Sequence, residues 1–278
     1  MPAMNRSVLT LSIFVALSAL VYAGPASLPS GKEMKEVAPA PPPCPTWSGF
    51  YVGVSGGYKF AATDIDLDLE GSWNGPSPVD PFDKETIEPT APNDLDTSGA
   101  ELGGVIGYNF QCGRWVFGLE AAGGYLWLRD SDNTGTFTVP LTGDEYNVAT
   151  SFKTHYLFTV GPRIGYTFCN WMPYVTGGLA VGDIDFEQHI TQFNQFQGGA
   201  PFFFEGGSVS ETNLGWMVGG GLEYAINNHW RLRAQYQFID LGSVDFNSQG
   251  FPNAAGYIGN HEIELREHNA SFAIIYGF

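Results

Sequence analysis

After a proline-rich start, apolar and polar residues alternate with a period of two, which predicts β-strands that have one apolar face. In residues 50–60 the even positions include Phe50, Val54 and Phe60, whereas the odd positions include Lys59. The alternation recurs in seven further segments, at residues 99–110, 115–127, 156–168, 173–181, 214–224, 230–238 and 269–278. Each segment reaches the ~9–11 residues that a tilted strand needs to cross a bilayer.

The connections between these segments alternate in length. Three are tight and lie near Gly113, Asn170 and Asn228. Four are long and lie near residues 61–98, 129–150, 183–212 and 242–262. Short turns at one end and long loops at the other are typical of outer-membrane barrels. The sequence therefore predicts a closed, antiparallel, eight-stranded transmembrane β-barrel with short periplasmic turns and long extracellular loops.

The large apolar residues share one face of each segment, and we expect this face to contact lipid. Aromatic residues near both ends of the segments, including Trp47 and Trp171 beside the tight turns, predict two interfacial girdles. The opposite face carries glycine and seven charged residues, which are Lys59, Glu101, Glu120, Arg163, Glu223, Arg231 and Arg233. Burial of a charge costs several kcal/mol unless the charge is paired. We expect a charge-paired interior, and the alternative is that some of these residues lie at a rim in water.

The N-terminus predicts export. Arg6 precedes an apolar run at residues 8–21, and the small-x-Ala sequence at 21–23 offers a cleavage site. The run is shorter than the ~20 residues of a membrane-spanning helix, so a signal peptide at 1–23 is favoured over an anchor. Residues 24–46 form a Pro-rich periplasmic linker, because proline favours extended geometry. The barrel is expected at 47–278.

Several of these strands resemble a known family. The sequence Trp-Ser-Gly-Phe-Tyr-Val-Gly at 47–53, followed by Gly-Gly-Tyr at 56–58, resembles the opening strand of porin-family outer-membrane β-barrel proteins, an OmpA-like group that includes surface antigens. Residues 173–180 and 215–223 are similar to later strands of that group. The resemblance implies a place in the cell outer membrane, among its lipid and lipopolysaccharide.

The C-terminal residues carry a further likeness. The terminal Ile-Tyr-Gly-Phe, with Tyr276 and Phe278, resembles the signal by which the barrel assembly machinery recognises its clients. The resemblance implies that this machinery is a partner of the chain.

The charge balance excludes one class of partner. The formal net charge is -17, and phosphate contacts need Lys and Arg, so no nucleic acid is expected to bind. The acidic residues between Asp64 and Asp96 predict a solvated surface loop. Calcium binding is the less favoured alternative, because the glycine of a calcium loop would fall at Leu69.

The three cysteines, Cys44, Cys112 and Cys169, all fall on the tight-turn side. Cys112 precedes one strand and Cys169 ends its antiparallel neighbour, so these two form a possible disulfide in an oxidising periplasm. The alternative of three free thiols stays open. No Cys-x-x-Cys spacing exists, which disfavours a zinc site.

Three functions are open to such a barrel. A barrel enzyme acting on lipid A or peptides needs a nucleophile beside a base on one face, but His268 and Ser271 fall on opposite faces of one strand. We therefore expect no catalytic residues, no cofactor and no metal. A small solute pore remains an alternative. The favoured function is that of a monomeric structural and surface protein, which contributes to envelope integrity and contacts a host or surface ligand through acidic loops.

Overall fold

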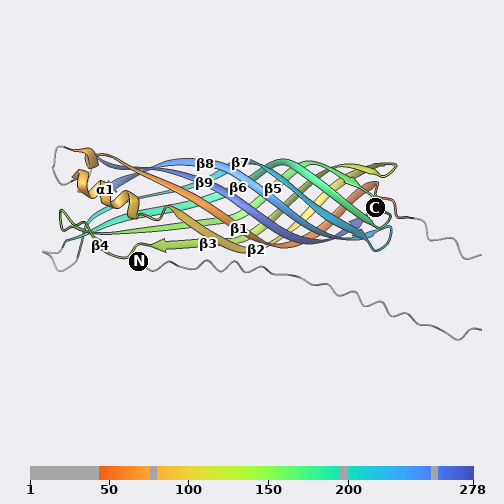
Figure 1. Ribbon diagram of the computed structural model, residues 1–278, viewed down its shortest axis with the longest axis horizontal. Coiled ribbons are helices and arrows are strands. Elements are labelled where there is room, and N and C mark those ends of the chain that lie inside the picture. Colours follow the sequence, from red (N-terminus) through yellow and green to blue (C-terminus); the bar gives the residue numbers. More distant parts are fainter. Residues whose placement is uncertain (1–43, 76–79, 195–199, 252–255) are drawn as a thin grey trace, which may run out of the picture. The chain divides into compact units, whose positions relative to one another are not determined.

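The computed structural model describes residues 44–75, 80–194, 200–251 and 256–278 (Figure 1). The predicted signal peptide at 1–23 and all but the last residues of the linker at 24–46 lie outside this part of the chain. Within the described residues, no helix has the length and apolar character needed to cross a membrane.

Eight long strands form a closed antiparallel barrel, as the sequence predicts (Figure 1). They are β1 (Gly49–Gly71), β2 (Asp94–Cys112), β3 (Trp115–Asn133), β5 (Glu145–Tyr166), β6 (Trp171–Asn194), β7 (Ala200–Ala225), β8 (Trp230–Phe251) and β9 (Tyr257–Gly277). Each long strand pairs with the next along the chain, and β9 pairs with β1 to close the ring. Closure leaves no unpaired strand edge in the membrane.

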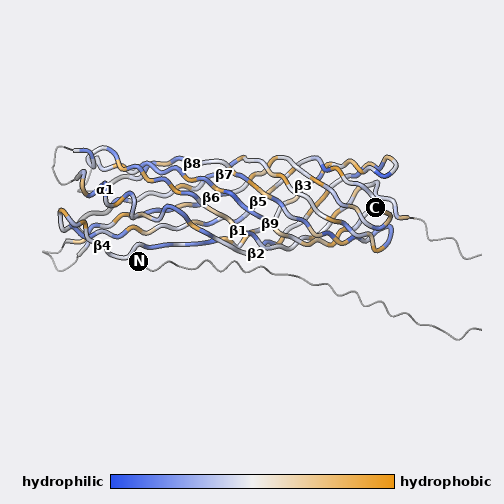
Figure 2. The backbone as a smooth tube through the Cα atoms, in the orientation of Figure 1, coloured by the Kyte–Doolittle hydropathy of each residue, from blue (hydrophilic) through white to orange (hydrophobic). Residues whose placement is uncertain are grey.

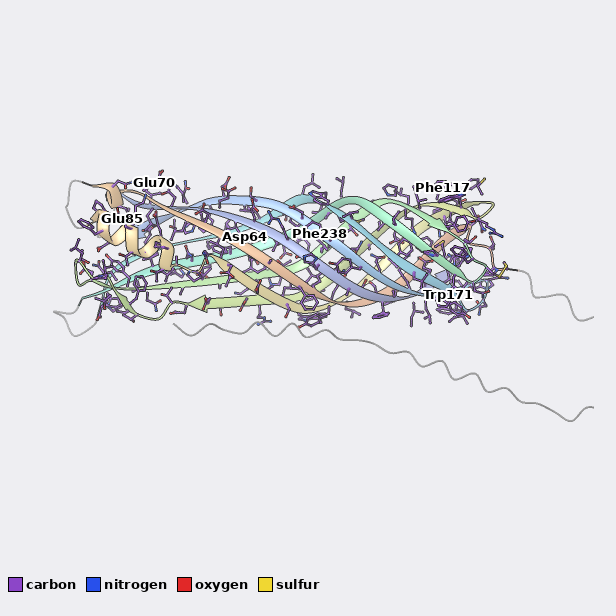
Figure 3. The ribbon with its side chains drawn as sticks, viewed as in Figure 1. Asp64, Glu70, Glu85, Phe117, Trp171 and Phe238 are labelled. Atoms are coloured by element: carbon purple, nitrogen blue, oxygen red, sulfur yellow. A yellow bond between two sulfur atoms is a disulfide. The ribbon has the colours of Figure 1, made fainter. Side chains whose placement is uncertain are left out.

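The two ends of the barrel differ. At one end, tight turns join β2 to β3, β5 to β6 and β7 to β8, and Gly113 adopts a φ of 61° in the first of them, a conformation that favours glycine. At the other end lie three short elements, η1 (Ser72–Asn74), α1 (Asp80–Thr90) and β4 (Phe137–Thr138). In Figure 3, Glu70 and Glu85 lie at the end that carries α1, and Phe117 and Trp171 lie toward the tight turns.

The strands are longer than predicted. Most of the ranges 129–150, 183–212 and 242–262, and both ends of the range 61–98, are strand, although these ranges are predicted to be long connections. In β1 the alternation continues beyond Phe60, but its polarity inverts: Asp64 and Asp66 point outward, whereas Ile65 and Leu67 are buried inside. The outer part of the strand thus packs as in a water-soluble barrel, with its apolar face inward.

The barrel therefore has two bands. In the membrane band, which runs from the tight turns to Phe60 of β1, large apolar residues face outward; Phe272 is 72% exposed. In the outer band, which runs from Ala61 of β1 to η1 and α1, the outward residues of β1 are mainly acidic. Figure 2 shows apolar residues recurring along the strands of the half that ends in the tight turns.

Candidate functional site

Two arginines and two glutamates form an ion cluster inside the membrane band. Arg163 of β5 contacts Glu120 of β3 at 2.9 Å and Glu223 of β7 at 2.5 Å. Arg233 of β8 contacts both oxygens of Glu120, at 2.6 and 2.8 Å, and also lies 2.8 Å from Glu223. All four side chains are at most 8% exposed. Two positive and two negative charges thus balance across the lumen, which offsets the cost of burying them.

Glycine on the neighbouring strand makes room for this cluster. A Cβ atom at Gly118 of β3 would lie 3.0 Å from Cγ of Arg163 and 2.3 Å from the Asn109 side-chain oxygen. The glycine-rich inner face therefore allows long charged side chains to cross the lumen and meet their partners on distant strands.

Two tyrosines complete the cluster. The Tyr51 hydroxyl donates to Glu120 at 2.5 Å and accepts a hydrogen bond from Arg163 at 3.0 Å. The Arg163 guanidinium lies 4.0 Å from the ring centroid of Tyr174, within cation–π range. The only sequence signal that places these two tyrosines in the interior is that they alternate in phase with the small-residue face.

Lys59 belongs to a second charged group, nearer the outer band. Its ammonium lies 2.8 Å from Glu267 and 3.9 Å from Glu101, and Asn269 donates to Glu101 at 2.8 Å. Lys59 and Glu267 are both fully buried. Glu267 is not among the predicted interior charges, because the last predicted segment begins at residue 269 whereas β9 begins at Tyr257.

Arg231 lies apart from both charged groups. Its guanidinium lies 4.8 Å from the ring of Trp47 and donates to the Thr46 carbonyl at 3.3 Å. Trp47 is 0% exposed and packs with Val116 and Met172 inside the turn end of the barrel. The prediction that Trp47 lies in an aromatic girdle is therefore wrong, because the chain before β1 turns into the lumen.

The predicted disulfide is also wrong. Cys169 is bonded to Cys44, with a Cα–Cα distance of 4.8 Å, and Cys112 is a free, exposed thiol. Cys44 approaches Cys169 because the same inward segment carries Trp47, whose indole N–H donates to the Cys169 carbonyl at 3.2 Å. The sequence places Cys44 in the predicted linker, and local spacing gives no sign that this linker re-enters the barrel.

Apolar side chains fill the lumen of the outer band, on the side of the charged groups that is away from the tight turns. One cluster includes Leu126, Phe152 and Ile184, and a second, beside η1 and α1, includes Trp73 and Ile87. Along β1 the inward positions run in order from Tyr51 through Lys59 and Ile65 to Leu69. These positions place the Arg163 cluster nearest the turns, followed by the Lys59 group and then the two apolar clusters.

A serine, a histidine and a glutamate meet in the outer band. Ser248 donates to Glu205 at 2.9 Å, and His261 lies 3.0 Å from the Ser248 hydroxyl. Trp73 donates to the second oxygen of Glu205 at 3.0 Å. Burial lowers the pKa of His261 to about 4 and raises the pKa of Glu205.

This group does not have the arrangement of a catalytic triad. A triad places histidine between the nucleophile and the carboxylate, whereas here Ser248 lies between Glu205 and His261. Each of the three residues is at most 2% exposed, so a substrate has no route to the hydroxyl. The group acts as a buried hydrogen-bond network that ties β7, β8 and β9 together.

Tyr276 and Phe278 lie at the turn end, on the outer surface. Phe278 is 74% exposed, and its ring packs edge-on against Tyr276 with centroids 5.2 Å apart. The backbone N–H of Phe278 donates to the Phe50 carbonyl at 2.9 Å, which fixes the C-terminus against β1. Recognition of these residues by an assembly machinery stays a prediction.

Known proteins resemble this chain over most of its length. The family model of the outer membrane protein beta-barrel domain matches residues 37–272. The 31 kDa outer-membrane immunogenic protein of Brucella melitensis biotype 1 is 31% identical over 236 residues, covering 83% of this chain and 87% of the relative. The 22 kDa outer membrane protein of Rhizobium leguminosarum bv. viciae is 24% identical over 221 residues, covering 78% and 75%.

Solved structures give weaker matches. OprG from Pseudomonas aeruginosa aligns with a TM-score of 0.43 and 12% identity, covering 83% of this chain and 97% of that chain. The outer membrane protease OmpT from Escherichia coli aligns with a TM-score of 0.45 and 9% identity, over the same shares of the two chains.

Proposed function

Since the chain belongs to the outer membrane protein beta-barrel domain family and is an outer-membrane protein, we propose that it is a structural and surface protein of the envelope. In this proposal the membrane band anchors the chain in lipid and does not conduct solutes. The outer band projects beyond the lipid and presents an acidic surface to the outside.

The filled lumen is the observation that carries the proposal. A solute would have to pass Trp47, the Arg163 cluster, the Lys59 group and two apolar clusters, and each of these levels is built from buried side chains. Eight strands enclose only enough room for side chains. No observation on the described residues favours the alternative of a solute pore or of an enzyme acting on lipid A or peptides.

The surface of the outer band supports a role in contacts. Asp64 of β1 lies between Asp94 of β2 and Glu264 of β9, and Asp66 lies opposite Glu262. Arg266 pairs with Asp64 and Glu264, but these five acidic residues outnumber that one arginine, so this part of the surface keeps a negative potential. We expect this surface to favour cationic partners, including divalent cations that bridge to lipopolysaccharide or to a host ligand. We expect a monomer, assembled through recognition of Tyr276 and Phe278.

Planar-bilayer recording tests the proposal. The refolded protein, inserted at single-molecule levels, is expected to give no steady current, whereas a general porin recorded in the same bilayer gives open-channel steps. A steady single-channel current that changes when Arg163→Glu reverses the charge in the lumen would contradict the sealed barrel. Incubation with lipopolysaccharide is expected to release no fatty acid, and release above a boiled control would favour an enzyme.

A further inference from the structure

An irregularity in β5 brings together three potential metal ligands on the outside of the barrel. The register of β5 shifts against β3 between Tyr125 and Leu128, and against β6 between Lys153 and Leu157. This bulge turns the backbone N–H groups of His155 and Tyr156 toward one carboxylate oxygen of Asp183 in β6, at 2.9 and 2.7 Å. Bulges commonly re-aim side chains in this way.

The donor atoms have a spacing that suits a small cation. Nδ1 of His155 lies 2.8 Å from Asp183 and 3.4 Å from Asp185, and all three donor atoms lie within 4.8 Å of one another. In a tetrahedral zinc site with bonds of about 2.0–2.2 Å, ligand atoms lie about 3.3–3.5 Å apart. The His155–Asp185 distance already meets this spacing, and the His155–Asp183 distance must increase by about half an ångström. The two aspartate oxygens, which lie within 4.8 Å of each other, must approach to the same spacing.

The second carboxylate distinguishes this group from a simple His–Asp hydrogen bond. Asp183 alone satisfies His155, yet Asp185 also points its oxygen at the same ring nitrogen. In the part of the chain that the structure describes, the Asp185 carboxylate forms no other hydrogen bond or ion pair. Lys153 lies opposite Asp185 in the register but is not within ion-pair distance. The Asp185 carboxylate is therefore free to serve as a metal ligand beside His155 and Asp183.

We propose that His155, Asp183 and Asp185 bind one zinc ion at the outer edge of the membrane band. The imidazole nitrogen favours zinc over calcium or magnesium, which prefer oxygen ligands. The two backbone N–H groups hold Asp183 in place as outer-sphere supports. Side-chain exposures of 42% for His155 and 34% for Asp185 provide an entry path. Three protein ligands leave a fourth position for water.

The site does not depend on whether the lumen is sealed, because it lies on the outer surface of the barrel. The cations near it are Lys153 and, opposite Lys153 on β3, Arg129. Both oppose binding of a further positive charge. Replacement of Lys153 by glutamine is therefore expected to tighten zinc binding.

Titration calorimetry with zinc chloride on tag-free, refolded protein in detergent tests the site, after treatment with EDTA and dialysis. We expect one saturable zinc per chain, and Asp185→Asn and His155→Gln are each expected to raise the Kd by about tenfold or more. Cobalt(II) in place of zinc is expected to give the visible absorption of a four-coordinate site, which both variants lose. Asp185→Asn is the milder change, because Asp185 does not support the bulge.

His268→Gln is the matched control. His268 also lies near the outer edge of the membrane band, but its ring nitrogen is hydrogen-bonded to the Tyr236 hydroxyl at 2.7 Å, and among the described residues no carboxylate lies within ion-pair distance of it. Its zinc Kd is expected to stay within twofold of wild type, and a heat-dependent gel shift verifies that each variant is folded. The proposal is overturned if wild type shows no saturable binding, or if Asp185→Asn and His155→Gln bind zinc as wild type does.

Discussion

Arg163 and Arg233 illustrate what a single residue requires inside a membrane barrel. Each guanidinium contacts two glutamates, and Tyr51 and Tyr174 occupy the space around them. Removal of one member of a buried pair leaves an uncompensated charge, which costs more than the pair itself contributes. The stability of the membrane band therefore depends on the complete cluster.

Arg163→Leu is expected to destabilise the barrel by about 3–5 kcal/mol, because Glu223 and Glu120 each lose a partner in a dry interior. Urea titration in detergent, followed by the gel shift between folded and unfolded forms, measures the change. Arg266→Leu is the matched control: Arg266 pairs with Asp64 and Glu264 on the surface and is 46% exposed, so its loss is expected to cost less than about 1 kcal/mol. Equal losses in the two variants would contradict the role of the cluster.

His261 makes the outer band sensitive to acid. Its pKa is lowered to about 4 in the folded chain from 6.5, so below pH 6.5 the unfolded chain takes up a proton that the folded chain does not. Stability is therefore expected to fall between pH 6.5 and about 4, by up to about 1.4 kcal/mol per pH unit, with no further loss from this residue below that range. Glu205, whose pKa is raised, acts in the opposite direction.

Hydrogen exchange in the outer parts of β8 and β9, corrected for intrinsic rates, measures this effect at pH 7 and pH 5. Wild type is expected to exchange faster at pH 5. His261→Gln keeps a donor for Ser248 but does not titrate, so its exchange is expected to change much less between the two pH values. Wild type and variant with the same pH dependence would exclude His261 as the cause.

At the scale of elements, the segment before β1 behaves as part of the barrel. Cys44 bonds to Cys169, and Trp47 packs inside the lumen beneath Arg231. The disulfide closes a loop with a sequence separation of 125 residues and fixes this segment against the turn between β5 and β6. The segment thus fills the lumen at its periplasmic end, below the Arg163 cluster.

Cys44→Ser is expected to lower the free energy of unfolding by about 2–5 kcal/mol, because the unfolded chain loses a long-range constraint. Thiol labelling under native, non-reducing conditions is expected to modify one thiol in wild type, Cys112, and a second in the variant when Cys169 is released. Cys112→Ser is expected to leave stability unchanged and to abolish labelling of the native protein. Labelling of all three thiols in unreduced wild type, after unfolding in denaturant, would contradict the Cys44–Cys169 bond.

At the scale of the whole molecule, the strands pass through two environments, lipid around the membrane band and water around the outer band. In β1 the outward residues change from Phe50 and Phe60 to Asp64 and Asp68, while the inward residues change from Lys59 to Ile65. The pairing register between β1 and β9 continues from one band into the other without interruption. One hydrogen-bonded ladder therefore supports a lipid-facing barrel and a water-facing barrel in series, and the apolar interior of the second stiffens the surface it presents.

The sequence by itself determined the number of strands, the lipid-facing side and the end that carries the tight turns. These features follow from side-chain alternation and turn residues, which are local. The sequence also contains the polarity inversion, since Ile65 and Leu67 alternate with Asp64 and Asp66, but no lipid-facing apolar phase extends over this stretch, so a loop is predicted there.

Only the tertiary structure decided which residues meet inside the barrel. Lys59 and Glu267 are separated by 208 positions and Cys44 and Cys169 by 125, and such partners depend on strand tilt and register around the closed ring. The bulge at His155 is likewise a feature that only the tertiary structure decides, because a shift of register is defined only against neighbouring strands. Alternation fixes the face of a residue, whereas the closure of the barrel fixes its neighbours.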